Sequence, residues 1–211
     1  MNFTSSRITP SLAIAVILLL CIAGLPSARG DNNVTAAATP AKAQMKHANE
    51  LLKKQDPPKV VPRLMDMATP DNTHVIVSLT KQRAYLLVGE EIALDTPISS
   101  GKRAGMTPSG SFTVLEKDPN HRSSIFGDFV DGSGRTVRGG VSLKIDSAPS
   151  GTHYVGASMK WFMRLTQDGV GMHVGILPGY PASHGCVRLP VDIAPLIYAK
   201  VKVGTPVEIG P

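Results

Sequence analysis

The sequence predicts a mainly β domain, arranged as a sandwich or barrel with one or two short helices. Three observations lead to this prediction: short β-branched runs follow one another, turn residues separate them, and only one segment has convincing helical spacing. Nine of the ten aromatic residues lie from Tyr85 to Tyr198, so the side chains best able to fill a core are concentrated there.

The first 30 residues have the features of a secretory signal peptide in their usual order. Arg7 supplies a positive charge, residues 12–25 form an apolar run, and Ala28-Arg29-Gly30 offers small residues for cleavage. The run is shorter than the ~20 residues that a membrane-spanning helix needs, which disfavours a retained anchor. We therefore expect cleavage, export to the periplasm or cell wall, and contact with the membrane only through this segment before cleavage.

Residues 31–71 have the composition of a spacer. Seven Ala, five Pro and no aromatic residue occur between Asp31 and Pro70, so this stretch cannot bury much apolar surface. A short helix at 43–54, ended by Pro57-Pro58, is an alternative to a partly ordered linker, which we favour. The folded domain is expected at residues 72–211.

Within that domain, runs of β-branched and apolar residues predict the strands, and Gly, Pro and Ser clusters predict the turns. A helix is expected at 191–200, because Ile193 and Ile197 share a face and Pro195 falls in the first turn, where its missing N–H is tolerated. The expected strands are 74–79, 84–88, 92–98, 112–115, 141–145, 162–165, 171–174 and 206–209.

The charge of the chain argues against nucleic acid as a partner. The formal net charge is +6, and removal of Arg7 and Arg29 with the signal peptide leaves +4. This excess is spread along the sequence without a block of Lys and Arg. It suits an anionic polymer such as a cell wall, whereas nucleic-acid binding needs a denser basic patch.

Cys186 is the one cysteine expected in the exported chain, because Cys21 falls within the signal peptide. It stands in Ser183-His184-Gly185-Cys186-Val187-Arg188, with His173 thirteen residues upstream. A thiol attacks carbonyl carbon as the thiolate, and an adjacent imidazole can take its proton. Cys186 is therefore a candidate nucleophile, with His173 and His184 as its candidate partners.

Neighbouring residues offer complementary chemistry. Gly185 can adopt a positive φ and lets the backbone approach a substrate, so that N–H groups near Gly185 and Cys186 can bind an oxyanion. Arg188 and Arg164 are candidates for holding a substrate carboxylate in a bidentate pair. His121 and His153 are weaker candidates for the lining of a cleft.

Two structural alternatives compete with a catalytic thiol. Cys186 lies near Val187 and Leu189 and could be a small buried hydrophobe. Two histidines and a cysteine could also bind zinc, but structural zinc sites usually have four ligands, and no CxxC or HxxxH pair is present. We expect no metal and no cofactor, while spacing alone leaves catalysis and burial equally open.

The residues around Cys186 resemble the signature of the L,D-transpeptidases of the YkuD type. This family has a His followed by Ser-His-Gly-Cys, as in His173 and Ser183-His184-Gly185-Cys186. The segment 107–112, Thr-Pro-Ser-Gly-Ser-Phe, is similar to the family's Thr-Pro-x-Gly-x-Phe, and residues 75–88 and 203–207 are similar to its opening and closing strands. The resemblance covers about residues 72 to 210. Arg188 stands where many members have Asn, and the interval from His173 to Ser183 is shorter than in much of the family.

This resemblance implies the mainly β L,D-transpeptidase fold and a reaction on peptidoglycan stem peptides. Cys186 would attack a tetrapeptide stem and release D-alanine, with His173 as base and then acid. Ser183, His184 and Gly185 would support the site and the oxyanion. The thioester would pass to an amine, either another stem in a 3→3 cross-link or a lysine of a wall-anchored protein.

Three other functions compete with transfer to an amine. An L,D-carboxypeptidase would hydrolyse the same thioester with water, and a non-catalytic wall-binding module would keep the fold but lose Cys186 or His173. A papain-like cysteine peptidase fits less well, because its Cys precedes its His in the sequence. We therefore expect a transferase.

Overall fold

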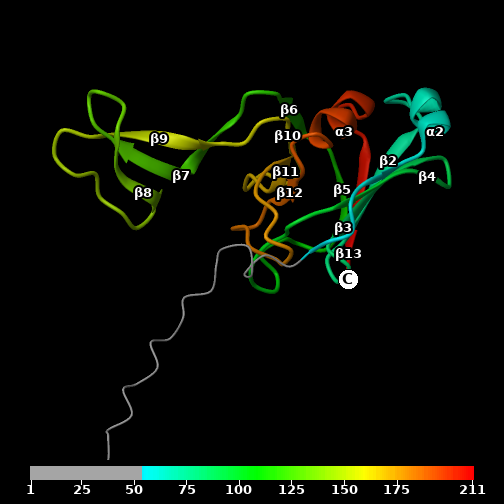
Figure 1. Ribbon diagram of the computed structural model, residues 1–211, viewed down its shortest axis with the longest axis horizontal. Coiled ribbons are helices and arrows are strands. Elements are labelled where there is room, and N and C mark those ends of the chain that lie inside the picture. Colours follow the sequence, from blue (N-terminus) through cyan, green and yellow to red (C-terminus); the bar gives the residue numbers. More distant parts are fainter. Residues whose placement is uncertain (1–53) are drawn as a thin grey trace, which may run out of the picture. The chain divides into compact units, whose positions relative to one another are not determined.

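The computed structural model describes residues 54–211, which form three β-sheets and two helices (Figure 1). The prediction of a mainly β domain with one or two short helices is confirmed. The expected signal peptide, the first part of the spacer and nearly all of the helix considered at 43–54 lie outside the described residues.

The first sheet has six strands, and its centre is built from a hairpin and a strand from the C-terminal end of the domain. The hairpin strands alternate as expected for one buried face: Val75 and Val77 are fully buried, whereas Ile76 between them is half-buried. The strand order is β1 (Lys59–Val60), β4 (Glu91–Pro97), β3 (Arg83–Val88), β2 (Thr73–Ser78), β13 (Pro206–Gly210) and β5 (Gly110–Thr113).

The second sheet is formed by β12 (Val187–Leu189), β11 (Gly171–Val174), β10 (Phe162–Arg164) and β6 (Glu116–Asp118), in that order. Its apolar face shares one core with the first sheet, since Met163, Met172 and Leu189 pack with Val75 and Leu86 in a single buried cluster. The sandwich arrangement expected from the sequence is therefore present.

Helix α3 (Ala194–Lys200) is the helix expected at 191–200, although it begins three residues later. Ile197 is fully buried and Val191 is 72% exposed, so the apolar residue at the expected start belongs to the preceding turn. At the other end, the Lys117 ammonium donates to the carbonyls of Tyr198 and Val201, which satisfies acceptors that a helix leaves free at its C-terminus.

The third sheet was not expected from the sequence, apart from a strand at 141–145. Its order is β8 (Thr136–Ser142), β7 (Arg122–Val130) and β9 (His153–Ser158), and residues 143–145 form a turn instead. Most of β8 is exposed, so it lacks the alternation that marks a half-buried strand. Where β9 meets β7, the residue is a glycine and not an apolar one, because the strands lie too close for a side chain. A Cβ on Gly156 would lie 2.1 Å from the Ser123 carbonyl oxygen.

The end of the expected spacer is part of the fold. Residues 59–60 pair with β4 as strand β1, and Pro62–Met67 form helix α2, whose Leu64 and Met65 enter the core. These residues were expected in the spacer because a six-residue helix is too short to show a helical period. Pro62 occupies the first helical turn, where proline is favoured.

Replacing Leu64 by Ala tests whether α2 stabilises the domain. Leu64 is 4% exposed, and we expect Leu64→Ala to lower the free energy of unfolding by about 2 to 3 kcal/mol, measured by urea denaturation. Met67→Ala on the same helix is the control, because Met67 is 51% exposed. Equal effects of the two variants would contradict a core role for α2.

Candidate active site

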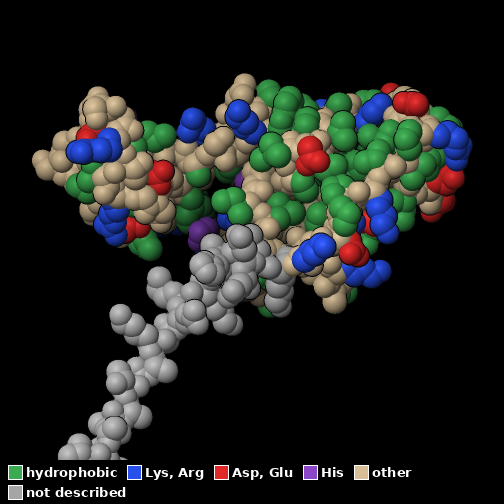
Figure 2. Space-filling view, viewed as in Figure 1, with side chains coloured by type: hydrophobic (Ala, Val, Ile, Leu, Met, Phe, Trp, Pro, Cys, Tyr) green, Lys and Arg blue, Asp and Glu red, His purple; other side chains and the backbone are tan. Residues whose placement is uncertain are grey.

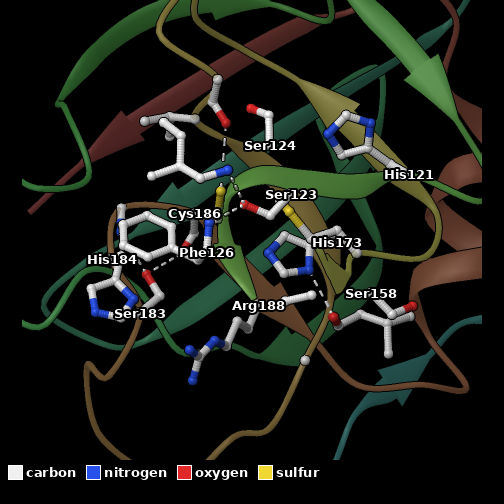
Figure 3. A pocket seen from close by; sticks show the side chains of 18 of the residues that line it. His121, Ser123, Ser124, Phe126, Ser158, His173, Ser183, His184, Cys186 and Arg188 are labelled. Atoms are coloured by element: carbon white, nitrogen blue, oxygen red, sulfur yellow. Dashed lines mark hydrogen bonds between the residues drawn. The ribbon is translucent and has the colours of Figure 1, made fainter. Parts of the chain in front are cut away.

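A cavity of about 450 Å³ lies between the second and third sheets and contains most of the residues singled out from the sequence. Ser123 and Phe126 of β7, Arg164 of β10, His173 of β11 and Cys186 line it (Figure 3). In Figure 2 the hollow appears between the side chains of the third sheet and those of the rest of the domain, and Lys and Arg are interspersed with Asp and Glu on the visible face. That face carries no block of one sign of charge.

Cys186 is a free, half-buried thiol directly before β12. Its Sγ lies 3.7 Å from the Gly169 carbonyl oxygen, to which the thiol donates. Burial raises the pKa of this thiol, while the backbone of Gly171 and the charges of Arg188 and Arg164 act in the opposite direction. The protonated thiol is therefore the resting form, so attack on a carbonyl needs a base.

His173 has the properties of that base. It lies within β11 and is 8% exposed, and burial lowers the pKa of its imidazole to about 4. The ring is therefore neutral at pH 7. Nδ1 lies 2.7 Å from the Val174 carbonyl oxygen, so Nδ1 carries the proton and Nε2 keeps its lone pair.

The parallel pairing of β11 with β12 brings the two groups together. In this register His173 is opposite Arg188, and Cys186 precedes the first residue of β12. Both His173 and Cys186 line the same cavity. His173 and Cys186 are thirteen residues apart in the sequence, and the pairing of β11 with β12 brings them onto neighbouring strands.

Ser183 and Gly185 shape the turn that ends at Cys186. The Ser183 hydroxyl donates to the Cys186 carbonyl oxygen at 2.5 Å and accepts from the Gly185 N–H at 3.0 Å. Gly185 has the expected positive φ, +139°, and a Cβ there would lie 2.9 Å from the Met106 carbonyl oxygen. Of the two expected oxyanion donors, the Gly185 N–H is therefore occupied, whereas the Cys186 N–H donates to no acceptor in residues 54–211.

Thr107 fastens this turn to the connection between β4 and β5, and sequence reasoning did not assign it to the site. Its hydroxyl donates to the Gly185 carbonyl oxygen at 2.6 Å and accepts from the Gly101 N–H at 2.8 Å. Thr107 is 4% exposed. Thr107 is the first residue of segment 107–112, which resembles the Thr-Pro-x-Gly-x-Phe segment of the family. That resemblance was the available sequence signal for a role of Thr107 in the site.

His184 joins the turn to the third sheet. Its ring stacks on Phe126 of β7 with centroids 4.4 Å apart, and the Lys102 ammonium lies 3.1 Å from Nε2. Burial lowers the pKa of His184, and the charges of Lys102 and Arg188 lower it further. Lys102 and Phe126 had no recognisable signal in the sequence, because each makes its contact across a long interval of chain.

The two candidate arginines differ in their partners. The Arg164 Nε lies 2.6 Å from the Glu116 Oε2, so this arginine has a carboxylate partner. Among the residues that the structure describes, no carboxylate pairs with Arg188. The Arg188 side chain packs across Gly175, because a Cβ on Gly175 would lie 2.6 Å from the Arg188 Cγ. The Arg188 guanidinium donates to the Ile176 carbonyl oxygen at 3.4 Å. Both line the cavity, and Arg188 is the freer partner for a carboxylate.

Of the two weaker histidine candidates, only one lies at the cavity. His121 lines the cavity, whereas His153 is exposed at the start of β9 and does not. Within residues 54–211, no three His, Cys, Asp or Glu side chains are grouped so that they could hold a metal ion. The same residues contain no helix with the length and hydropathy needed to cross a membrane.

Comparisons with known proteins match this chain and its fold to one family. The family model for the L,D-transpeptidase catalytic domain, YkuD, matches residues 72–209. Among solved structures, an L,D-transpeptidase from Mycobacterium smegmatis is 23% identical with a TM-score of 0.50, over 66% of this chain and 59% of that one. L,D-transpeptidase 1 from Mycobacterium tuberculosis is also 23% identical, with a TM-score of 0.45 over 66% and 62% of the two chains. The present chain thus spans less than two thirds of these proteins, and no curated protein matches it.

Replacing Thr107 by Val tests the fastening of the turn. The variant keeps the shape of the side chain but leaves the buried Gly101 N–H and Gly185 carbonyl without their partner. We expect a loss of about 2 kcal/mol in the free energy of unfolding, measured by urea denaturation. Thr113→Val in the exposed part of β5 is the control. Similar losses in both variants would contradict the role given to Thr107.

The depressed pKa of His173 predicts a dependence of stability on pH. Its pKa is about 4 in the folded protein against 6.5 for an unperturbed histidine, so between these values the unfolded chain binds a proton that the folded one excludes. Stability should therefore fall as the pH is lowered from about 7 to about 4, with a contribution of about 3 kcal/mol from this group. His173→Gln should remove that part of the slope in urea denaturation at several pH values. An unchanged slope would contradict the buried, neutral ring.

Proposed function

The chain belongs to the L,D-transpeptidase catalytic domain family, and we propose that it is a cysteine-dependent acyl transferase acting on peptidoglycan stem peptides. The observation that carries this proposal is the buried, neutral His173 beside the strand that Cys186 precedes, with both residues on one cavity. We propose residues 72–211 as the catalytic domain, and the periplasm or cell wall as its place of action after removal of residues 1–30.

In the first half of the reaction Cys186 Sγ attacks the carbonyl between the L-centre of the diamino acid and the terminal D-alanine. His173 Nε2 takes the thiol proton as the S–C bond forms, because Nδ1 is engaged with the Val174 carbonyl. The same proton then goes to the nitrogen of D-alanine, which leaves as the C–N bond breaks. A thioester on Cys186 and a neutral His173 result.

The oxyanion of the tetrahedral intermediate would be held by the Cys186 N–H. The occupied N–H of Gly185 orients this turn through Ser183 instead of binding the oxyanion itself. Arg188 is suited to a substrate carboxylate, since it lines the cavity and no acidic side chain within residues 54–211 pairs with it.

In the second half an amine takes the acyl group from Cys186. Another stem's diamino acid would give a 3→3 cross-link, and a lysine of a wall protein would give an anchored protein. Water would give an L,D-carboxypeptidase with the same first half-reaction. A non-catalytic wall-binding module is disfavoured because both reacting groups are present on the cavity.

Intact-mass measurement with a tetrapeptide stem tests the proposal. Wild-type protein should gain a mass corresponding to the stem less D-alanine, and Cys186→Ala should gain none. His173→Ala should slow this acylation by about 100-fold or more, whereas His184→Ala should slow it by less than about tenfold. Absence of the adduct in folded wild-type protein would refute the proposed function. Loss of acylation in His184→Ala with near-full activity in His173→Ala would reverse the assignment of the base.

A further inference from the structure

A second imidazole faces the cavity in an arrangement that the first half-reaction does not use. His121 lies between β6 and β7, and its Nδ1 is 3.2 Å from the Asp118 carboxylate. Its ring stacks on Phe162 with centroids 4.2 Å apart, and the His173 ring lies 6.3 Å from the same phenylalanine. His121 and His173 thus pack against one aromatic ring. Both imidazoles also line the pocket, where Figure 3 labels them.

The carboxylate fixes the tautomer of His121. Asp118 accepts the Asn120 N–H through its other oxygen at 2.9 Å, which orients the carboxylate toward His121. Since a carboxylate accepts hydrogen bonds, the proton of His121 is on Nδ1 and Nε2 keeps its lone pair. Asp118 would also stabilise the imidazolium formed when Nε2 takes a proton.

The backbone holds this pair in place. The His121 carbonyl oxygen accepts from the Met159 N–H at 2.9 Å, and the Pro119 carbonyl oxygen accepts from the Trp161 N–H at 3.1 Å. These bonds tie the turn between β6 and β7 to the connection between β9 and β10. His121 is therefore positioned before any substrate arrives.

The two imidazoles have different access to solvent. His173 is buried and its partner is a carbonyl, whereas His121 is half-buried and its partner is a carboxylate. His121 can therefore pass a proton to solvent more readily than His173 can. The charged or titratable groups that contact His121 or line its cavity, besides Cys186, are Asp118, Arg164, Asp168, His173, His184 and Arg188.

We propose that His121, held by Asp118, is the general base for the amine acceptor in the second half-reaction, which rests on the function proposed above. The neutral amine attacks the thioester carbonyl, and its proton passes to His121 Nε2 as the C–N bond forms. The C–S bond then breaks, Cys186 leaves as the thiolate and regains a proton from solvent, and His121 releases its proton to solvent. The products are an amide and the starting enzyme.

Separate measurement of the two half-reactions tests this role. Thioester formation is followed by intact mass with a tetrapeptide stem, and its decay is followed after addition of the same stem as amine acceptor. His121→Ala should slow the decay by about 100-fold while slowing formation by less than about threefold. Asp118→Asn should slow the decay by a smaller factor, and the exposed His153→Ala is the control and should change neither rate.

Chemical rescue distinguishes a His121 that acts as a base from a His121 whose ring is needed only for packing. Added imidazole should restore the decay rate of His121→Ala, and substituted imidazoles of the same size should do so in the order of their basicity. The proposal is overturned if formation and decay slow by equal factors, if neither changes, or if rescue follows size alone. A wild-type protein that forms no thioester would instead refute the function proposed for Cys186 and this role with it.

Discussion

The parallel pairing of β11 and β12 is the constraint on which the candidate site depends. Parallel neighbours cannot be joined by a tight turn, so residues 175–186 leave the end of β11 and return to its start. This loop is held where it passes the connection between β4 and β5, because Ser183 and Arg188 form isolated bridges with Gly101 and Ser99. Cys186 is thus fixed directly before a strand, and His173 is fixed on the strand beside it.

Burial within this pairing shifts the pKa values of Cys186 and His173, the two groups proposed to react, in opposite directions. It raises the pKa of the Cys186 thiol and lowers the pKa of the His173 imidazole, so both are neutral at rest. Neutral groups cost less to desolvate than a thiolate and an imidazolium. The charge would therefore develop only when a carbonyl is present to accept the sulfur, with Arg164 and Arg188 nearby to favour it.

The parts of the structure that were predicted from sequence are those with a local signal. Alternation marked β2 and β3, and a chemical motif marked Cys186 and His173. The third sheet gave no such signal, because most of β8 is exposed and β7 and β9 meet through the glycines Gly127 and Gly156. Thr107 and Phe126 reach the site through contacts between elements distant in sequence, which a single sequence does not display.

The position of β13 has a consequence for the order in which the protein can mature. β13 follows every other described element along the chain, yet it lies inside the six-stranded sheet, between β2 and β5. During synthesis, β2 and β5 must wait for this late segment before the sheet can close, since pairing over such separations is slow. The turn that presents Cys186 is bonded through Thr107 to the connection between β4 and β5, two strands of that sheet. A reactive thiol would therefore become organised only after nearly the whole domain has emerged.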